Sequence, residues 1–337
     1  MNLKNCNVSL CALLSGLTVA RTAEAQAPLG VRAQGMAGAF VGVADDASAV
    51  YWNPAGLATG AIVSFLVAFG EETTAPEDPQ SAAGERDTGT MVAVSLPPVG
   101  LAYYRVGTYG TAVATPAVAG LPSREEVGRS VHALVTSTVG VSLLQSLTDH
   151  IVVAATPKIV RGAAASGFSS ALLSSDALDT AGDLERRGST AFDIDAAVMV
   201  AVDRLRAGVV GRNLTTPSFA IGDTSEIELE REVRAGVAWG SGWPGNSRFA
   251  VSLDGDLLSR VTPFGDRRDI AGGVETWWWN RSIALRGGAR RSTVGAARGA
   301  ITGGVSYAVR PSIFVEGHVA AGERSERGWS VGVRAGF

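Results

Sequence analysis

The chain has 337 residues, of which 46% are hydrophobic, and a formal net charge of −3. So mild a charge argues against a nucleic-acid partner, which usually requires a concentrated basic face. The mean hydropathy of +0.19 is high for a chain with 42 glycines, yet after the N-terminal segment no apolar run is long enough for a transmembrane helix. A membrane-like composition without membrane helices leaves the closed β-barrel as the spanning architecture.

Residues 1–25 are predicted to be a secretory signal peptide. A basic start precedes an apolar run over residues 8–20, and residues 23–25 have the small-x-small pattern of a cleavage site. The alternative is a single membrane anchor, but the run is too short to cross about 30 Å of hydrocarbon. Both cysteines, Cys6 and Cys11, lie in this segment. Cleavage therefore leaves a chain without disulfides or thiolate metal sites.

Residues 26–60 are predicted to form a small hatch inside the barrel. The segment is apolar and rich in glycine, and the interior of a neighbouring barrel needs filling, so the lumen is its expected location. The hatch motif is Asn53, Pro54, Ala55 and Gly56, in which Asn53 is expected to cap a tight turn or a helix start with Pro54 at its first position and Gly56 relaxes the backbone. The candidate apolar ligand-lining residues of this segment are Met36, Phe40, Val41, Tyr51 and Trp52.

Residues 61–337 are predicted to form an antiparallel transmembrane β-barrel. Successive strand residues point to opposite faces, so a barrel strand alternates apolar residues facing lipid with polar or small residues facing the lumen. Phe192 and Ile194 share one face of such a strand, whereas Asp193 and Asp195 share the other. A slip of one residue would turn these carboxylates onto lipid, and the alternation therefore fixes the register.

The alternation predicts fourteen strands, an even number, as single-chain bacterial barrels have. The connections alternate between short turns and longer, mostly polar loops. In outer-membrane barrels the short turns are periplasmic, and both chain ends fall on that side. A soluble β-sandwich or propeller has similar strands but does not explain this alternation of loop lengths. The predicted spans are 61–70, 89–96, 99–107, 130–145, 150–161, 190–202, 205–213, 232–240, 247–256, 267–278, 282–291, 298–309, 311–321 and 328–337.

Charged residues on the lumen face are expected to pair with one another across the interior, because a water-poor lumen requires paired charges. The predicted set is Asp193, Asp195, Asp254, Asp256, Glu275, Glu316, Arg234, Arg286, Arg290 and Arg334.

The stretch RAQGMAGAFVGVADDASAVYWNPAGLA, residues 32–58, resembles the N-terminal signature of FadL/TodX-type outer-membrane transporters. PorV-like and TraF-like proteins share this signature. The resemblance implies a barrel closed by an N-terminal hatch, to which Asn53, Pro54 and Ala55 belong. It also implies a hydrophobic ligand, such as a long-chain fatty acid, and lateral release through a gap in the wall near an early strand.

Pro97, Pro98 and Gly100 are the candidate region for such a lateral gap. Proline has no N–H to donate to a neighbouring strand, so this Pro–Pro pair is expected to interrupt the pairing between the second and third strands. The alternative is a rigid periplasmic turn.

The sequence predicts a non-enzymatic transporter of hydrophobic small molecules. His132, His150 and His318 have no ligand-spaced neighbours, and the chain has neither a Gly-x-Ser-x-Gly elbow nor a phosphate loop. No catalytic residue, metal or cofactor is therefore expected. The expected partners are outer-membrane lipid, a hydrophobic small molecule such as a fatty acid, and the outer-membrane assembly machinery, with the chain itself a monomer in the bacterial outer membrane.

The alternative is a PorV-like carrier or assembly partner for exported proteins, or a secretion- or conjugation-type envelope protein without transport activity. An apolar, ligand-sized cavity between hatch and wall would favour transport. A lumen filled by salt bridges would favour the partner role.

The chain ends on Phe337, in phase with the apolar face of its last strand. This terminal aromatic resembles the signal read by the outer-membrane assembly machinery. We predict that Phe337→Ala leaves synthesis unchanged but slows insertion, measured by pulse-chase appearance of the heat-modifiable folded form. A variant that inserts at the wild-type rate would remove the terminal residue from the assembly signal.

Overall fold

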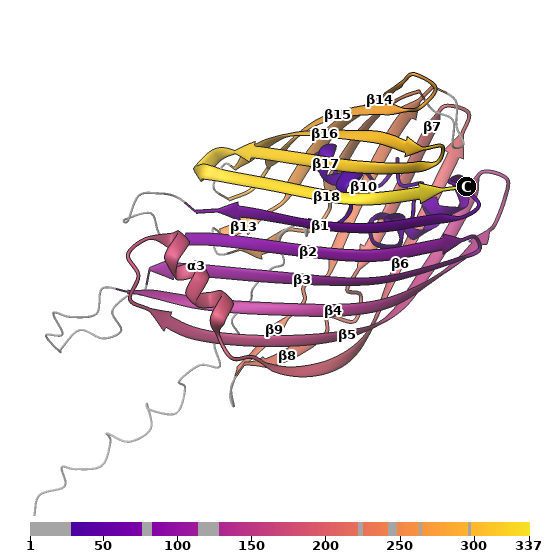
Figure 1. The fold of residues 1–337 in the computed structure, drawn as a ribbon. Coiled ribbons are helices and arrows are strands. Elements are labelled where there is room, and N and C mark those ends of the chain that lie inside the picture. The colour runs from indigo at the N-terminus through magenta and orange to yellow at the C-terminus, as the bar shows by residue number, and fades with distance from the viewer. Residues whose placement is uncertain are drawn as a thin grey trace, which may run out of the picture.

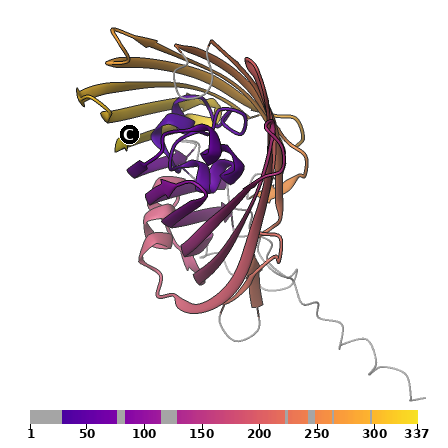
Figure 2. The same cartoon turned by 90° about the vertical axis from the view of Figure 1, so that its right-hand side faces the viewer.

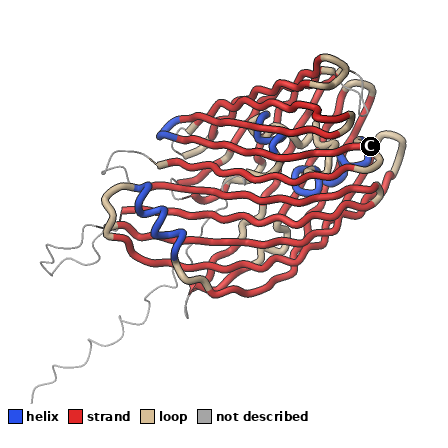
Figure 3. The backbone as a smooth tube through the Cα atoms, in the orientation of Figure 1, coloured by secondary structure: helices blue, strands red, loops and turns tan. Residues whose placement is uncertain are grey.

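Fourteen strands within the described part of the chain close into one antiparallel barrel (Figures 1 and 3). The fold class predicted from the alternation is therefore confirmed. The computed structural model describes residues 28–75, 83–113, 128–221, 225–241, 248–262, 265–295 and 298–337. The predicted signal peptide, residues 1–25, lies outside these ranges. No helix in the described ranges is long and apolar enough to cross a membrane.

Consecutive barrel strands pair with each other, and the first strand closes the ring on the last. The barrel strands are β1 Ser64–Thr74, β2 Ala83–Leu96, β3 Val99–Val113, β4 Arg129–Ser146, β5 Ile151–Ser169, β6 Arg187–Val202, β7 Leu205–Arg212, β10 Glu232–Gly240, β11 Phe249–Asp256, β14 Asp269–Trp278, β15 Ile283–Ser292, β16 Gly299–Arg310, β17 Ile313–Gly322 and β18 Glu326–Gly336.

The two faces of each strand separate as the sequence predicts. Phe192 is 61% exposed on the outside of β6, whereas Asp193 and Asp195 are buried in the lumen. On β18, Trp329 is half exposed and the adjacent Ser330 is buried. The outer face is therefore apolar, and the register keeps charges off the lipid.

The wall is tall on one side and low on the other. Strands β4 and β5 have 18 and 19 residues, whereas β7 and β11 have 8 each. A tilted strand needs about 9–11 residues to cross a bilayer, so the low side barely spans it and the tall side extends beyond. Strand β6 pairs with β7 only over 196–202, because the chain turns away at Asn213, which has a positive φ of 54°.

Two hairpins fill the long-loop end where the wall is low. They are β8–β9, Ser218–Ile221 and Ser225–Glu228, and β12–β13, Arg260–Thr262 and Gly265–Arg267. The sequence predicts only a polar loop for the first of these segments. Phe219 is nevertheless buried in an apolar cluster with Val160, and its ring packs on Gly162, where a Cβ would lie 2.4 Å away.

Helix α3, Ser174–Asp183, lies across the outer face of β2, β3 and β4 (Figure 1). The sequence predicts only a loop here. Ala177 and Ala181, one turn apart, pack on Val131 of the wall, because residues four apart share one helix face. Arg86 of β2 and Asp179 of the helix form an ion pair of 2.8 Å.

The hatch, residues 28–60, occupies the short-turn half of the lumen, where the indigo coils of Figure 2 are enclosed by the strands. It contains α1 Val31–Gly35, α2 Ala49–Trp52 and the 3₁₀ helix η1 Pro54–Thr59. Helices this short are marginal in water. Contacts with the wall therefore hold them, and within 28–57 only Asp45 is not fully buried.

The gap expected at Pro97, Pro98 and Gly100 is not present. Strand β2 pairs without interruption with β1 and with β3, up to Leu96 opposite Val99. The two prolines form the short turn beyond the last pair, so their missing N–H groups break no ladder. They are joined by a cis peptide bond. Gly100 instead makes room for the hatch, because a Cβ there would lie 2.7 Å from Leu57.

We predict that the long-loop end is extracellular. Asp183→Cys, on exposed α3, should be labelled by an impermeant maleimide on intact cells, whereas the matched Asp149→Cys, in the exposed β4–β5 turn, should be labelled only after the envelope is disrupted. The opposite labelling pattern would overturn the orientation. Asp78, in the long loop after β1, lies outside the described residues.

Candidate functional site

The lumen wall has an uncharged sector and a charged sector. Near the short-turn end, the inward residues of β1, β2 and β3 carry no charge and include Leu66, Met91 and Tyr104. The hatch packs its apolar side chains on this sector. Fully burying one such side chain stabilises by roughly 1.5–3 kcal/mol, so the hatch is held here mainly by the hydrophobic effect. The shared core comprises Leu29, Val31, Ala33, Met36, Phe40, Val43, Ala44, Ala47, Ala49, Val50, Tyr51, Trp52, Leu57, Leu66, Ala68, Met91, Ala93, Ala102, Tyr104, Val106 and Ala238.

Small residues in the uncharged sector fit the start of the hatch. A Cβ on Gly89 would lie 2.6 Å from the carbonyl oxygen of Pro28, and one on Gly70 would lie 3.0 Å from the same atom. Real Cβ atoms do not approach a backbone oxygen so closely, so a side chain at Gly89 would displace the chain at Pro28. Trp52 fixes the next residue, because its indole N–H donates to the Leu29 carbonyl at 3.0 Å.

The Asn-Pro-Ala-Gly stretch is the turn that orders the hatch. The Oδ1 of Asn53 accepts from the Ala55 amide at 3.2 Å, and its Nδ2 donates to the Val41 carbonyl at 3.0 Å. Pro54 is the first residue of η1, where its missing N–H costs nothing. Gly56 faces the Ala44 carbonyl so closely that a Cβ would lie 2.0 Å from its oxygen.

The side chain of Asp254 of β11 binds backbone groups of the hatch. Its Oδ2 accepts from the amides of Phe40 and Val41, both at 2.8 Å. On β10, Arg234 donates to the Gly38 carbonyl at 3.3 Å and to Asp256 at 2.5 Å. These contacts satisfy backbone groups that the irregular hatch cannot pair within itself.

Arg32 of α1 is the centre of an ion-pair cluster that joins hatch to wall, the Arg32 clamp. Its Nε and Nη2 donate to the Glu275 carboxylate of β14, both at 2.7 Å. Arg286 donates to the same carboxylate at 2.6 Å. Arg32 also pairs with Asp45 and, at 3.3 Å, with Asp46 within the hatch. Two arginines sharing one buried carboxylate make that carboxylate hard to replace.

Asp46 links the clamp to the last strand. It lies 3.9 Å from Arg334, which pairs with Glu316 at 3.0 Å. Burial acts to raise the pKa of Asp46, but the charges of Arg32 and Arg334 and hydrogen bonds from Ser48 hold that pKa below its usual value. The carboxylate is therefore ionised across the physiological pH range.

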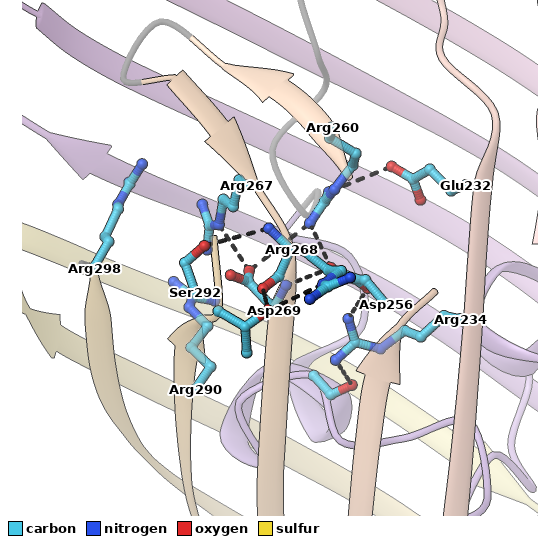
Figure 4. A network of polar contacts seen from close by, with 12 residues as sticks. Glu232, Arg234, Asp256, Arg260, Arg267, Arg268, Asp269, Arg290, Ser292 and Arg298 are labelled. Carbon is cyan, nitrogen blue, oxygen red and sulfur yellow. Dashed lines mark hydrogen bonds and ion pairs between the residues drawn. The ribbon is translucent and has the colours of Figure 1, made fainter. Parts of the chain in front are cut away.

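Ion pairs also fill the lumen on the long-loop side of the hatch. Figure 4 shows Arg260, from the β12–β13 hairpin, reaching Glu232 at 3.4 Å and Asp256 at 3.2 Å. Arg267 of the same hairpin pairs with Asp269 at 2.7 Å. The two arginines of the hairpin therefore pair with carboxylates of the barrel wall.

Two further groups of pairs line the lumen, one of them between the neighbouring strands β5 and β6. Lys158 lies 2.7 Å from Asp195 and 3.1 Å from Asp193, and Arg298 lies 2.9 Å from Glu85. The predicted lumen charges all form ion pairs, as expected, but most pair with a neighbouring strand along the wall and not across the interior. Sequence reasoning missed Arg32, Arg260, Arg267 and Arg298, because three of these lie in or beside loops without alternation and Arg32 precedes the first strand.

The candidate ligand-lining residues are brought together, but as a packed core. Met36, Phe40, Val41, Tyr51 and Trp52 are each at most 7% exposed. Beside Tyr51 and Tyr104 lies a cavity of about 10 Å³, which holds one water at most. Within the described ranges, no cluster of three His, Asp or Glu side chains is arranged to hold a metal ion.

Larger cavities lie at the surface. One of about 680 Å³ opens at the short-turn end between the hatch and the ends of β14–β18. Two others are largely apolar grooves on the outer wall, one of about 520 Å³ over β6, β7, β10 and β11 and one of about 630 Å³ over β11 and β14–β17.

The chain is similar to one family of known proteins in sequence and to several solved structures in fold. The family described as "F plasmid transfer operon, TraF, protein" matches residues 86–256, just over half of the chain. No curated protein sequence matches this chain.

Solved structures of similar fold include the toluene transporter TbuX of Ralstonia pickettii, with a TM-score of 0.61 at 14% identity over 91% of this chain and 98% of that chain. A FadL homologue of Pseudomonas aeruginosa gives 0.58 at 11% identity, over 91% of this chain and 98% of that one. The toluene transporter TodX of P. putida gives 0.55 at 11% identity, over 86% and 94%. These likenesses show the fold, that of a FadL/TodX-type outer-membrane barrel, and the fold implied by residues 32–58 is thereby confirmed.

We predict that Glu275→Gln loosens the hatch without opening the wall. The substitution leaves Arg32 and Arg286 without their shared charge, and removing one partner of a buried ion pair costs about 3–5 kcal/mol. Ion conductance in planar bilayers should rise and the thermal midpoint should fall. The matched control is Glu228→Gln, at an exposed position of β9. Equal conductance and midpoint for Glu275→Gln and wild type would show that the clamp does not hold the hatch.

Proposed function

The chain belongs to the family of F plasmid transfer operon TraF proteins, and we propose that it is an outer-membrane barrel for the uptake of hydrophobic small molecules. The observation that supports this proposal is the uncharged sector of β1–β3, on which the hatch packs. The fold agrees with it, since TbuX and TodX, whose structures are similar, are toluene transporters.

In the short-turn half of the lumen, a hydrophobic molecule would move along the uncharged sector. The charged sector excludes it, because replacing a satisfied ion pair by apolar contact leaves buried charges without partners. Along β1–β3 the molecule would take the place of hatch side chains such as Leu29 and Trp52, and the contacts exchanged would be apolar on both sides. Passage to the short-turn end thus requires movement of the hatch, and the compound class is a fatty acid-like or aromatic hydrocarbon.

The ion pairs that fill the rest of the lumen favour a second candidate. A barrel whose described lumen holds salt bridges and no ligand-sized apolar cavity suits a carrier or assembly partner for exported proteins, or a conjugation-type envelope protein. In that role the hatch and lumen would be a rigid scaffold, and the outer surface would carry the function.

Loosening the hatch turn separates the two candidates. Asn53→Gly with Pro54→Gly removes a cap and a fixed φ, each worth on the order of 1 kcal/mol. We expect the double variant to assemble and keep its heat-modifiable migration, but to change uptake of radiolabelled palmitate and toluene into cells. The control is Thr148→Gly with Asp149→Gly. It removes the hydrogen bonds that the Thr148 hydroxyl accepts from the His150 and Ile151 amides in the β4–β5 turn and leaves the hatch intact.

Mass spectrometry of compounds that co-purify with the folded protein is the second readout. A bound hydrophobic compound together with altered uptake supports transport. Unaltered uptake and no such compound would reject transport and leave the scaffold role. Failure of the double variant to fold would show that the hatch is part of the structural core, and the co-purification readout on the wild type then decides.

A further inference from the structure

The cavity of about 680 Å³ at the short-turn end, here called the basal pocket, lies between the hatch and the wall. Arg32, Asp45 and Asp46 of the hatch line one side. The ends of β14–β18 and the turns between them line the other, through residues such as Arg281 and Phe314. Its volume lies in the range of small-molecule sites, about 300–1,000 Å³. The end of the chain and the indigo hatch lie at this same end of the barrel (Figure 1).

The lining of the basal pocket has an excess of positive charge. Arg32, Arg281, Arg310 and Arg334 contribute four positive charges, and the two aspartates contribute two negative ones, so the lining carries a net charge of +2. Glu275, Glu316 and Arg286 lie behind this lining, where they pair with Arg32 and Arg334. Including these three, the cluster remains at +1.

The two aspartates are occupied by groups of the protein. Asp45 accepts from Arg32. Asp46 accepts from the Ser48 amide at 2.9 Å and hydroxyl at 2.5 Å through Oδ1, and from Arg32 at 3.3 Å through Oδ2. The negative charge of the lining is thus concentrated around Arg32, on the hatch side of the pocket.

Aromatic rings form the wall side of the pocket, and guanidinium groups lie over the faces of these rings. Arg281 lies over the Trp277 ring, 4.8 Å from its centroid, and Arg334 lies over the Phe314 ring at 4.6 Å. The two rings meet edge to face at 5.3 Å. Burial and the positive charge of Arg32 lower the pKa of Arg281, as expected where cations are in excess. Arg310, at the mouth, is exposed.

We propose that the basal pocket binds an anion attached to an apolar or aromatic group, such as a carboxylate beside a hydrophobic side chain. Guanidinium groups supply planar donors that match a carboxylate. The exposed side chains of Val309 and Pro311, in the lining next to Arg310, supply apolar surface beside them. The carboxylate can belong to a free amphipathic molecule or to the C-terminus of a protein in the periplasm. A ligand here touches hatch and wall together, so its binding resists displacement of the hatch. The proposal concerns binding alone and stands whether or not the barrel transports.

Isothermal titration calorimetry on the purified full-length barrel in detergent tests the proposal. The first probe is 4-phenylbutyrate with its neutral isostere 4-phenylbutanamide. The second is a short peptide ending in Phe with a free C-terminus, with the same peptide amidated. At least one carboxylate should bind about tenfold more tightly than its amide, as expected for charge-assisted hydrogen bonds.

Arg281→Gln with Arg310→Gln should abolish that tenfold preference. Both residues lie at the barrel rim, so the variant should fold, as heat-modifiable migration will verify. The matched control, Arg204→Gln with Arg248→Gln, changes exposed arginines beside other short turns and should keep the preference. Raising NaCl from about 50 to 500 mM should weaken only the carboxylate arm, which tests the wild type without any substitution.

Binding of the small carboxylate alone identifies a free molecule as the source, and binding of the peptide alone identifies a protein partner. Equal affinity of both carboxylates and their amides, no binding of either carboxylate, or a preference that survives the double substitution would overturn the proposal.

Discussion

Every backbone N–H and C=O within a bilayer must find a partner in the protein, and this constraint determines the rest of the molecule. The ladder is complete only because β1 pairs with β18 along its whole length. The amide and carbonyl of Phe337 extend that seam to Val63 with hydrogen bonds of 2.8 and 3.1 Å. Closure creates a lumen, and the lumen in turn has to be filled.

The lumen is filled in two chemically different ways. Near β1–β3 the filling is apolar, because the wall offers small and hydrophobic side chains and the hatch offers Trp52 and its neighbours. Elsewhere it is ionic, and inward charges such as Lys158, Arg290 and Arg298 meet opposite charges from other strands. A buried ion pair contributes little net stability, but losing one partner is costly. The ionic sector therefore specifies where the hatch and hairpins sit more than it strengthens the barrel.

The strands could be predicted from sequence because the alternation is enforced by lipid. Predicted and observed bounds agree within one or two residues for strands such as 205–213 and 232–240, observed as Leu205–Arg212 and Glu232–Gly240. Beyond the bilayer this pressure is absent, so the extension of β5 to Ser169 and the helix α3 were not predicted. The hatch turn at Asn53 was predictable because its side chains act locally.

The partners of the hatch were not predictable, because they depend on contacts distant in sequence. Arg32 meets Glu275, 243 residues away, and no local pattern encodes that distance. The prediction of a gap at Pro97–Pro98 was wrong for a related reason. Proline disrupts a ladder only where its N–H would have been used, and a position two residues to either side would have had the expected effect.

The Arg32 clamp also constrains the order of events in biogenesis. The partners of the hatch, Glu275 and Arg334, lie on β14 and β18, which leave the ribosome long after the hatch does. We therefore expect the hatch to reach its final contacts only after β14 and β18 are in place. Contacts of such high sequence separation form slowly, so the earliest part of the chain stays without its apolar partners until the latest part has been made.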